Sequence, residues 1–174
     1  MFALSKSESE LNLTLHQSNQ TLFARINNIN NDEQSAIPWI VWLLENPDSI
    51  FPLPGKINLY NHDCLHILLE RDISLFDEAF VVGFTMGSDL RTNRFHLAVF
   101  KILSSLFYPQ EYKFNQLHFK LFALAFDYGR SLKIKNLNQF NFKAYENKTV
   151  SELRKYLGID LSEVKQCFDS VVKI

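Results

Sequence analysis

Four residues with metal-ligating side chains lie close together in the sequence: His62, Asp63, His66 and Glu78. On an α-helix, which has about 3.6 residues per turn, His62 and His66 lie one above the other, and Asp63 lies about 100° round the helix from His62. All three can therefore face one point beside the helix. Two imidazoles and a carboxylate suit a divalent cation such as zinc, iron, manganese or magnesium. Histidine pairs at this spacing also occur without a metal, so the motif alone leaves both interpretations open.

Glu78 can join the other three residues only if the chain turns back on itself. It follows His66 by twelve residues, and on an uninterrupted helix this separation would place it about 120° away. A charged run after His66 can end a first helix. Ser74, with Asp77 three positions on, resembles the capping box that begins a second helix. We therefore expect a metal-binding helical hairpin over residues 58–86, which brings Glu78 back to the histidines.

Two further segments, residues 95–108 and 114–132, are apolar round most of a helical circumference. Helices of this kind are either buried in a packed core or line a cavity for an apolar ligand, and the sequence leaves both interpretations open. A cavity would hold a lipid tail against aromatic side chains. The candidates for its lining are Phe95, Phe100, Phe119, Phe122 and Phe126.

Two arginines, Arg91 and Arg94, come just before and at the start of the first apolar segment. A guanidinium group binds phosphate or carboxylate with two parallel hydrogen bonds, so these residues are candidates for a head-group site. The simpler interpretation is that they are solvated side chains at the start of a helix.

The composition of the whole chain predicts one folded helical domain. It has 174 residues, of which 47% are hydrophobic and 21% charged, with only 5 glycines and 5 prolines. So few turn-forming residues predict an all-α fold, a single-domain bundle over residues 1–174 with about seven to eight helices. A formal net charge of −1 without a basic segment indicates no nucleic-acid partner. The sequence shows no signal peptide and no run of roughly 18 apolar residues, so we expect a cytoplasmic protein.

Capping motifs place other helices. Thr149 and Glu152 form a capping box, and Gly158 provides the matching C-terminal stop. This closing part of the chain carries no chemistry of its own and is interpreted as scaffold. Helical spacing or capping also predicts helices at about residues 7–29, 32–45 and 160–172.

Residues 62–78 match His-Asp-x-x-His, eleven residues and Glu, and in this they resemble the coenzyme Q (ubiquinone) biosynthesis Coq-four family at every fixed position. Residues 145–159 resemble the closing segment of that family, which contains Leu-Arg-x-x-Leu-Gly-Ile. The resemblance covers roughly residues 45–160. The chain departs from the family at residues 83–88, where the family has a Gly-Leu-Pro-like stretch, and it lacks the family's Trp-Pro pair before the closing helix. It is thus similar to a divergent branch.

This resemblance implies an all-helical fold in which His62, Asp63, His66 and Glu78 hold a divalent cation. It implies a hydrophobic cavity near the cation for a prenylated quinone precursor or another isoprenoid lipid. It also implies oxidative decarboxylation of the quinone ring, other biosynthetic enzymes as partners, and peripheral association with the inner face of a membrane.

Two alternatives stay open beside this interpretation. The first is a non-catalytic scaffold or lipid-presenting protein of a biosynthetic complex, in which the metal serves the fold. The second is a metal-dependent phosphohydrolase, a class that also uses an adjacent His-Asp pair and for which His16 and Asp127 are the available further ligands. The sequence leaves the substrate open, and it is compatible with a homodimer.

Overall fold

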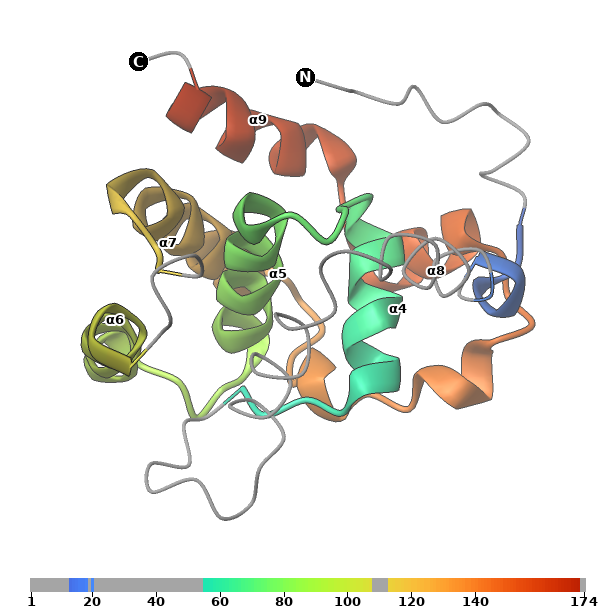
Figure 1. Ribbon diagram of the computed structural model, residues 1–174. Helices are drawn as coiled ribbons and strands as arrows, with labels where there is room; N and C mark the ends of the chain where they lie inside the picture. Colours follow the sequence, from blue (N-terminus) through green and yellow to red (C-terminus); the bar gives the residue numbers. More distant parts are fainter. Residues whose placement is uncertain (1–12, 19, 21–54, 108–112, 173–174) are drawn as a thin grey trace.

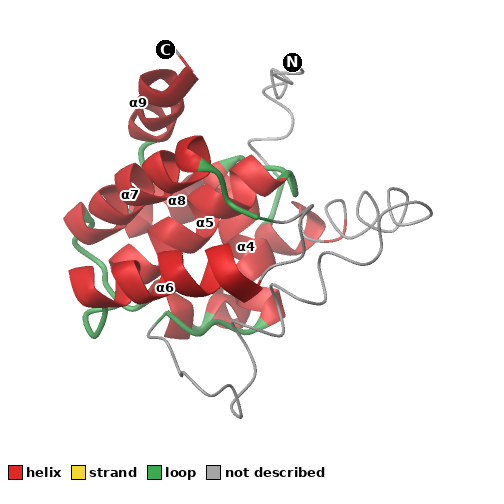
Figure 2. Cartoon of the chain, turned by 60° about the vertical axis from the view of Figure 1, so that its left-hand side comes forward, coloured by secondary structure: helices red, strands yellow, loops and turns green. Residues whose placement is uncertain are grey.

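The computed structural model describes residues 13–18, 20, 55–107 and 113–172 (Figure 1). Within these ranges every regular element is a helix and no strand is present, so the prediction of an all-α fold is confirmed (Figure 2). The α-helices are α4 (Leu59–Leu69), α5 (Leu75–Ser88), α6 (Arg94–Phe107), α7 (Gln116–Ser131), α8 (Val150–Leu157) and α9 (Leu161–Val172), with short 3-10 helices η2 (Leu137–Gln139) and η3 (Phe142–Tyr145).

The N-terminal predictions are covered only in part. The helix expected at residues 32–45 lies outside the described residues. Of the helix expected at residues 7–29, residues 15–18 and 20 are described and helical. The backbone just before this short piece pairs with the start of α8, since the N–H of Val150 donates to the carbonyl oxygen of Leu13 at 3.0 Å.

Helix α5 lies between α4 on one side and α7 on the other (Figure 1). Its contact with α7 is unusually close because glycine occupies the crossing. A Cβ atom added to Gly83 or Gly87 would lie 2.4 or 2.1 Å from the carbonyl oxygen of Phe122 or Phe126, respectively, and one added to Gly129 of α7 would meet the backbone of α5 equally closely. No larger residue fits at these positions unless the backbones separate. The stretch that departs from the Coq-four pattern thus has a packing role in this chain.

Two clusters of buried apolar side chains flank α5. The larger one joins α4, α5, α7, α8 and α9, and the smaller one joins α5 and α7 to α6, which packs along them (Figure 2). The smaller cluster consists of Ala79, Val82, Met86, Phe100, Phe114, Phe122 and Phe126.

The capping predictions are confirmed. The side chain of Ser74 accepts a hydrogen bond from the backbone N–H of Asp77 at the start of α5. Thr149 and Glu152 form both hydrogen bonds of the capping box at the start of α8, and Gly158 ends that helix with a φ of 75°. In the described part of the chain, no helix combines the length and the apolar character needed to cross a membrane.

Candidate metal centre

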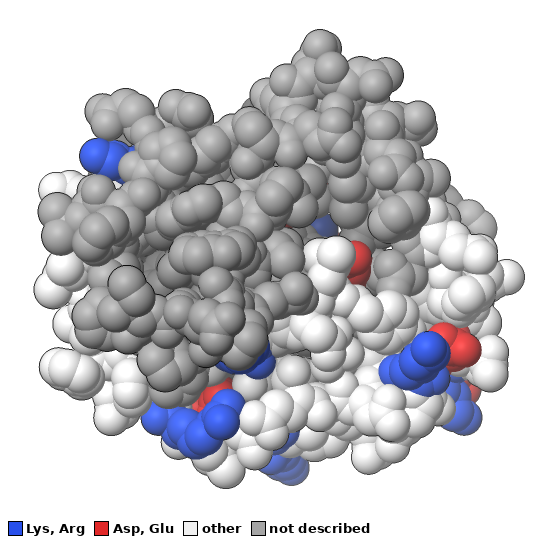
Figure 3. Space-filling view, turned by 60° about the horizontal axis from the view of Figure 1, so that its bottom comes forward, with Lys and Arg blue, Asp and Glu red and all other residues white. Residues whose placement is uncertain are grey.

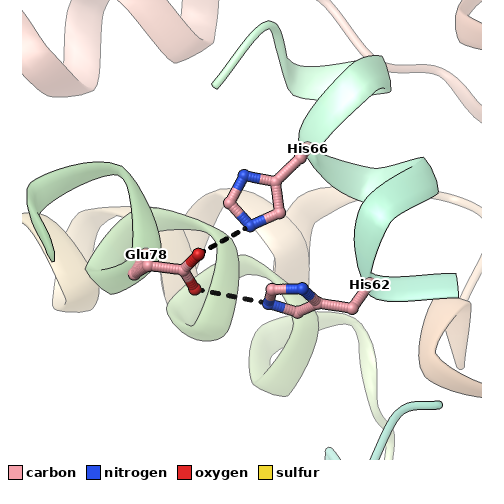
Figure 4. A group of neighbouring side chains, drawn as sticks. All are labelled: His62, His66 and Glu78. Carbon is pink, nitrogen blue, oxygen red and sulfur yellow. Dashed lines mark ion pairs between the residues drawn. The ribbon is translucent and has the colours of Figure 1, made fainter. Parts of the chain in front are cut away.

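Helices α4 and α5 bring three of the four predicted ligands together. His62 and His66 lie one turn apart on α4, and Glu78 lies in the first turn of α5. Both imidazole rings point across the gap between the helices towards the carboxylate (Figure 4). Nε2 of His62 lies 3.4 Å from Oε2 of Glu78, and Nε2 of His66 lies 3.1 Å from Oε1. The hairpin expected from the angular position of Glu78 is therefore present.

The three side chains are buried, and the atoms that face one another form ion pairs that do not have hydrogen-bond geometry. His62, His66 and Glu78 are 7%, 2% and 8% exposed. Among the described residues, Nε2 of each histidine and Oε2 of Glu78 have no hydrogen-bond partner, despite the short distances between them. One ligand atom from each residue lies within 4.8 Å of the others. Because unpaired buried polar atoms are costly, and because two imidazoles with a carboxylate are a common ligand set, these residues fit a divalent cation.

The same arrangement shifts the pKa values of its members. Burial lowers the pKa of His62, but the charge of Glu78 and the neighbouring Asp63 carboxylate outweigh burial and raise this pKa to about 10. Burial raises the pKa of Glu78, but the imidazoles of His66 and His62 outweigh it and hold the pKa well below its usual range. Without a cation, a proton on His62 therefore faces an ionised Glu78. A cation bound between these residues takes the place of that proton.

Asp63, the fourth predicted ligand, lies outside this group of three. Its Oδ1 is 3.9 Å from Nδ1 of His62, the ring nitrogen that does not face Glu78. The difference from the prediction has a geometric reason. Asp63 is about 100° round α4 from His62, and once the imidazoles direct Nε2 at α5, the adjacent carboxylate lies beside the His62 ring and not beyond it.

Side chains in the turn hold the two helices of the hairpin together. Glu70 ends α4 in the left-handed conformation, with a φ of 53°. Arg71 donates from Nε to the carbonyl oxygen of Leu69 at 3.2 Å and pairs with Asp77 of α5 at 3.5 Å. Ser74 in turn donates to Asp77 at 2.6 Å. These contacts link the end of α4 to the start of α5, and so fix the position of Glu78 relative to the histidines.

Arg154 is a supporting residue that sequence reasoning missed, in the segment interpreted as scaffold. Although charged, it is buried, and it donates to the carbonyl oxygens of Leu68 at 2.8 Å and Ile67 at 3.0 Å. It also pairs with Glu70 at 3.0 Å. These carbonyls belong to the last turn of α4, where few helical N–H partners are left, and that of Ile67 also accepts from the N–H of Glu70 at 3.2 Å. Arg154 therefore fastens α8 to the helix that carries both histidines. The available signal was an arginine directly beside Leu153, on the buried face of a short helix.

The other candidate residues are not brought to the centre. The guanidinium of Arg91 donates two hydrogen bonds to the carboxylate of Asp89, from Nη2 to Oδ2 at 2.7 Å and from Nε to Oδ1 at 3.1 Å. This bidentate contact is therefore used within the protein. Arg94 is exposed at the first residue of α6. His16 and Asp127, the further ligands of the phosphohydrolase alternative, are both exposed, and neither belongs to the three-residue group.

Of the five phenylalanines predicted to line a cavity, one is exposed and four pack in the smaller cluster. Phe95 is 71% exposed on α6. The rings of Phe100 and Phe122 are stacked, with centroids 4.8 Å apart and planes 4° from parallel. Phe126 is buried in the same cluster, and Phe119 is partly buried against it. This cluster also includes Ala79, the residue after Glu78 on α5. The aromatic side chains therefore pack against the same helix that carries Glu78.

Three protein ligands leave positions free on a cation that takes four to six, so water or a substrate atom can complete the coordination. Among the described residues the group offers three ligands, which is the number found in open, ligand-binding zinc sites, whereas structural zinc sites use four. Comparisons with known proteins add no family, because no family model, no curated protein and no solved structure matches the chain.

Proposed function

We propose that the protein binds a single divalent cation through His62, His66 and Glu78, and that the cation holds the polar head of a prenylated quinone precursor or a related isoprenoid lipid. The cation is supported by three buried atoms that lie close together without hydrogen-bond partners among the described residues: Nε2 of His62, Nε2 of His66 and Oε2 of Glu78. The lipid is supported by the resemblance of residues 62–78 to the Coq-four motif and by the aromatic cluster that begins beside Glu78.

The ligand set allows two kinds of chemistry. Two histidines and one carboxylate with open positions occur in non-haem iron oxygenases and also in zinc hydrolases. A redox-active cation would supply electron transfer with dioxygen for oxidative decarboxylation of an aromatic acid, whereas zinc or magnesium would supply Lewis-acid polarisation of a carboxylate or phosphate. We favour oxidative decarboxylation, because the Coq-four resemblance points to it.

The residues around the cation have different roles in binding. The histidines and Glu78 fix the cation, and burial keeps bulk water away from it. Ala79 and Val82 continue along α5 from Glu78 into the aromatic cluster.

The test is metal and lipid analysis of the purified protein. The wild-type protein is expected to retain stoichiometric iron, manganese, zinc or magnesium by elemental analysis, and mass spectrometry of an organic extract is expected to show an isoprenoid compound. His66→Ala should abolish metal retention, whereas His16→Ala, which removes an exposed histidine, should leave it unchanged. A protein with neither metal nor any bindable isoprenoid would refute the proposal.

The scaffold alternative, with peripheral attachment to a membrane, is favoured by a separate observation on α6 and the loop before it. Leu90, Phe95 and Ile102 are each more than half exposed. Residues 90–107 contain three basic and no acidic residues. On the face shown in Figure 3, Lys and Arg side chains lie along the lower edge, with some Asp and Glu side chains beside them. Exposed apolar side chains beside cations match an anionic lipid surface.

Sedimentation with vesicles tests this second function. The wild-type chain is expected to bind vesicles that contain anionic phosphatidylserine or cardiolipin more strongly than neutral phosphatidylcholine vesicles. Phe95→Ser should weaken this binding, and Tyr156→Ser on α8, also an exposed aromatic, should not. Equal binding of both variants and wild type would show that this surface of α6 does not contact the membrane.

A further inference from the structure

The position of Asp63 gives it a role other than that of a ligand, and this inference rests on the proposed metal centre. Its Oδ1 lies 3.9 Å from Nδ1 of His62, and Nε2 of the same ring faces Glu78. A neutral imidazole carries its proton on one nitrogen and offers the other as an electron-pair donor. If Nε2 of His62 binds a cation, its proton must be on Nδ1, directly opposite the Asp63 carboxylate.

Burial strengthens this contact. The side chains of His62 and Asp63 are 9% and 15% exposed, so water screens the pair only weakly. The separation is that of an ion pair and is longer than a hydrogen bond, so the carboxylate acts through its charge. Binding of a cation to Nε2 withdraws electrons from the ring and makes the Nδ1–H group more positive, which increases the attraction to Asp63.

The two histidines differ in this respect. Nδ1 of His66 is buried and has no hydrogen-bond partner among the described residues, whereas His62 has a carboxylate beside its outer nitrogen. Metal-binding histidines commonly depend on such an outer carboxylate, which selects the tautomer and raises the basicity of the ring. The asymmetry predicts that removal of the Asp63 charge acts on the centre through His62.

We infer that Asp63 is a positioning residue, whose carboxylate keeps the His62 ring in the Nδ1–H tautomer with Nε2 directed at the cation. It is not one of the atoms that coordinate the metal. The protein therefore uses the four residues of the motif as three ligands and one outer carboxylate.

Cobalt(II) is the probe for the test, because its visible absorption reports the number and kind of ligands. Affinities of the full chain are measured by competition with a chelator for wild type, Asp63→Asn, Asp63→Glu and Asp72→Asn. Asp72 lies in the turn of the same hairpin and is exposed, so it provides a charge-matched control. We expect Asp63→Asn to bind cobalt about 10- to 100-fold more weakly, with the absorption spectrum of the saturated protein unchanged. Asp63→Glu, which keeps the carboxylate, should restore most of the affinity, and Asp72→Asn should match wild type.

The outcomes separate this inference from the proposed function. Failure of the wild-type chain to bind cobalt or zinc would remove the metal centre itself, and with it the role of Asp63. If wild type binds and Asp63→Asn binds equally well, the centre stands and the positioning role is wrong. If the saturated Asp63→Asn protein shows an altered cobalt spectrum and zinc X-ray absorption shows one oxygen fewer, Asp63 is a ligand. Equal melting temperatures of metal-free Asp63→Asn and wild type exclude a general loss of structure.

Discussion

Helix α5 has a buried carboxylate at each end, and the two are used in opposite ways. At its C-terminal end, Asp89 is fully buried and accepts hydrogen bonds from the backbone of Gly55, from the amide of Asn138, and from the backbone and side chain of Arg91. At its N-terminal end, Glu78 is nearly as buried, but its Oε2 has no hydrogen-bond partner among the described residues.

The difference shows which carboxylate supports the fold and which is available to a ligand. A buried charge that is surrounded by donors from distant parts of the chain fixes those parts relative to one another, because each donor depends on it. A buried charge that faces two imidazole nitrogens at 3.1 and 3.4 Å, in ion pairs without hydrogen-bond geometry, can exchange these partners for a cation. Burial alone would rank the two sites alike, and the count of partners separates them.

The largest expected effect is on Asp89. Asp89→Ala leaves the buried donors of Gly55 and Asn138 without their acceptor, so we expect the free energy of unfolding to fall by about 2–4 kcal/mol. Glu78→Gln should cost the metal-free protein less than half as much, because His62 can release its proton once the carboxylate charge is gone and no buried charge then remains unpaired. Urea denaturation of both variants at neutral pH, without metal, measures the two losses.

The two variants should differ in the reverse sense in metal binding. Glu78→Gln removes a ligand and should lose cobalt binding, whereas the folded fraction of Asp89→Ala should bind with wild-type affinity. Equal stability losses in the two variants, or retained cobalt binding in Glu78→Gln, would show that the contrast between the ends of α5 has no functional meaning.

The metal centre is also expected to depend on pH, and the Asp89 network is not, near neutrality. Since the pKa of His62 is raised to about 10 in the metal-free protein, a proton occupies this residue at pH 7 and the cation must displace it. The apparent affinity for the cation should therefore rise with pH, by about tenfold or 1.4 kcal/mol per unit between pH 7 and 9. The pKa of Asp89 is lowered, since the Arg91 contacts outweigh burial, so this group stays ionised over the whole range.

Isothermal titration calorimetry in two buffers of different ionisation enthalpy measures the proton that is released. The heats should differ between the buffers by the amount for one proton, and the difference should shrink towards pH 10. A pH-independent affinity would mean that His62 is neutral in the metal-free protein and that Glu78 does not hold a proton there.

Local sequence signals were enough to predict the hairpin and the approach of His62, His66 and Glu78. The spacing of His62 and His66 fixes their common face, and the mismatch of Glu78 together with the cap at Ser74 predicts the turn between two helices. These features act within a few residues of one another, where helical geometry determines positions. The chain before residue 55 offered comparable patterns, but they lie largely outside the described residues.

Contacts between distant segments could not be predicted in the same way. Arg154 reaches carbonyls of α4, which precede it by more than eighty residues, and no local pattern names an acceptor. Gly83 and Gly87 have a spacing that places them on one face of a helix, but the closeness of α7 depends on which helix packs there. The place of Asp63 outside the group of three has a related reason. Its angular position on α4 was correct, but the direction of the His62 ring depends on the carboxylate of another helix.

The smallest expected effect concerns the cap that positions Glu78. The hydroxyl of Ser74 accepts from the backbone N–H of Asp77 at 3.2 Å, and its loss in Ser74→Ala should cost about 1 kcal/mol of stability. Asn115→Ala at the start of α7 removes an equivalent cap and should cost a similar amount. Only Ser74→Ala should also weaken cobalt binding, by a few-fold, because fraying of the first turn of α5 moves Glu78 and leaves Asp89 in place. Equal cobalt affinities in the two variants would mean that the contacts of Arg71 and Arg154 hold the hairpin without help from the cap, and that the ligand end of α5 is as rigid as its structural end.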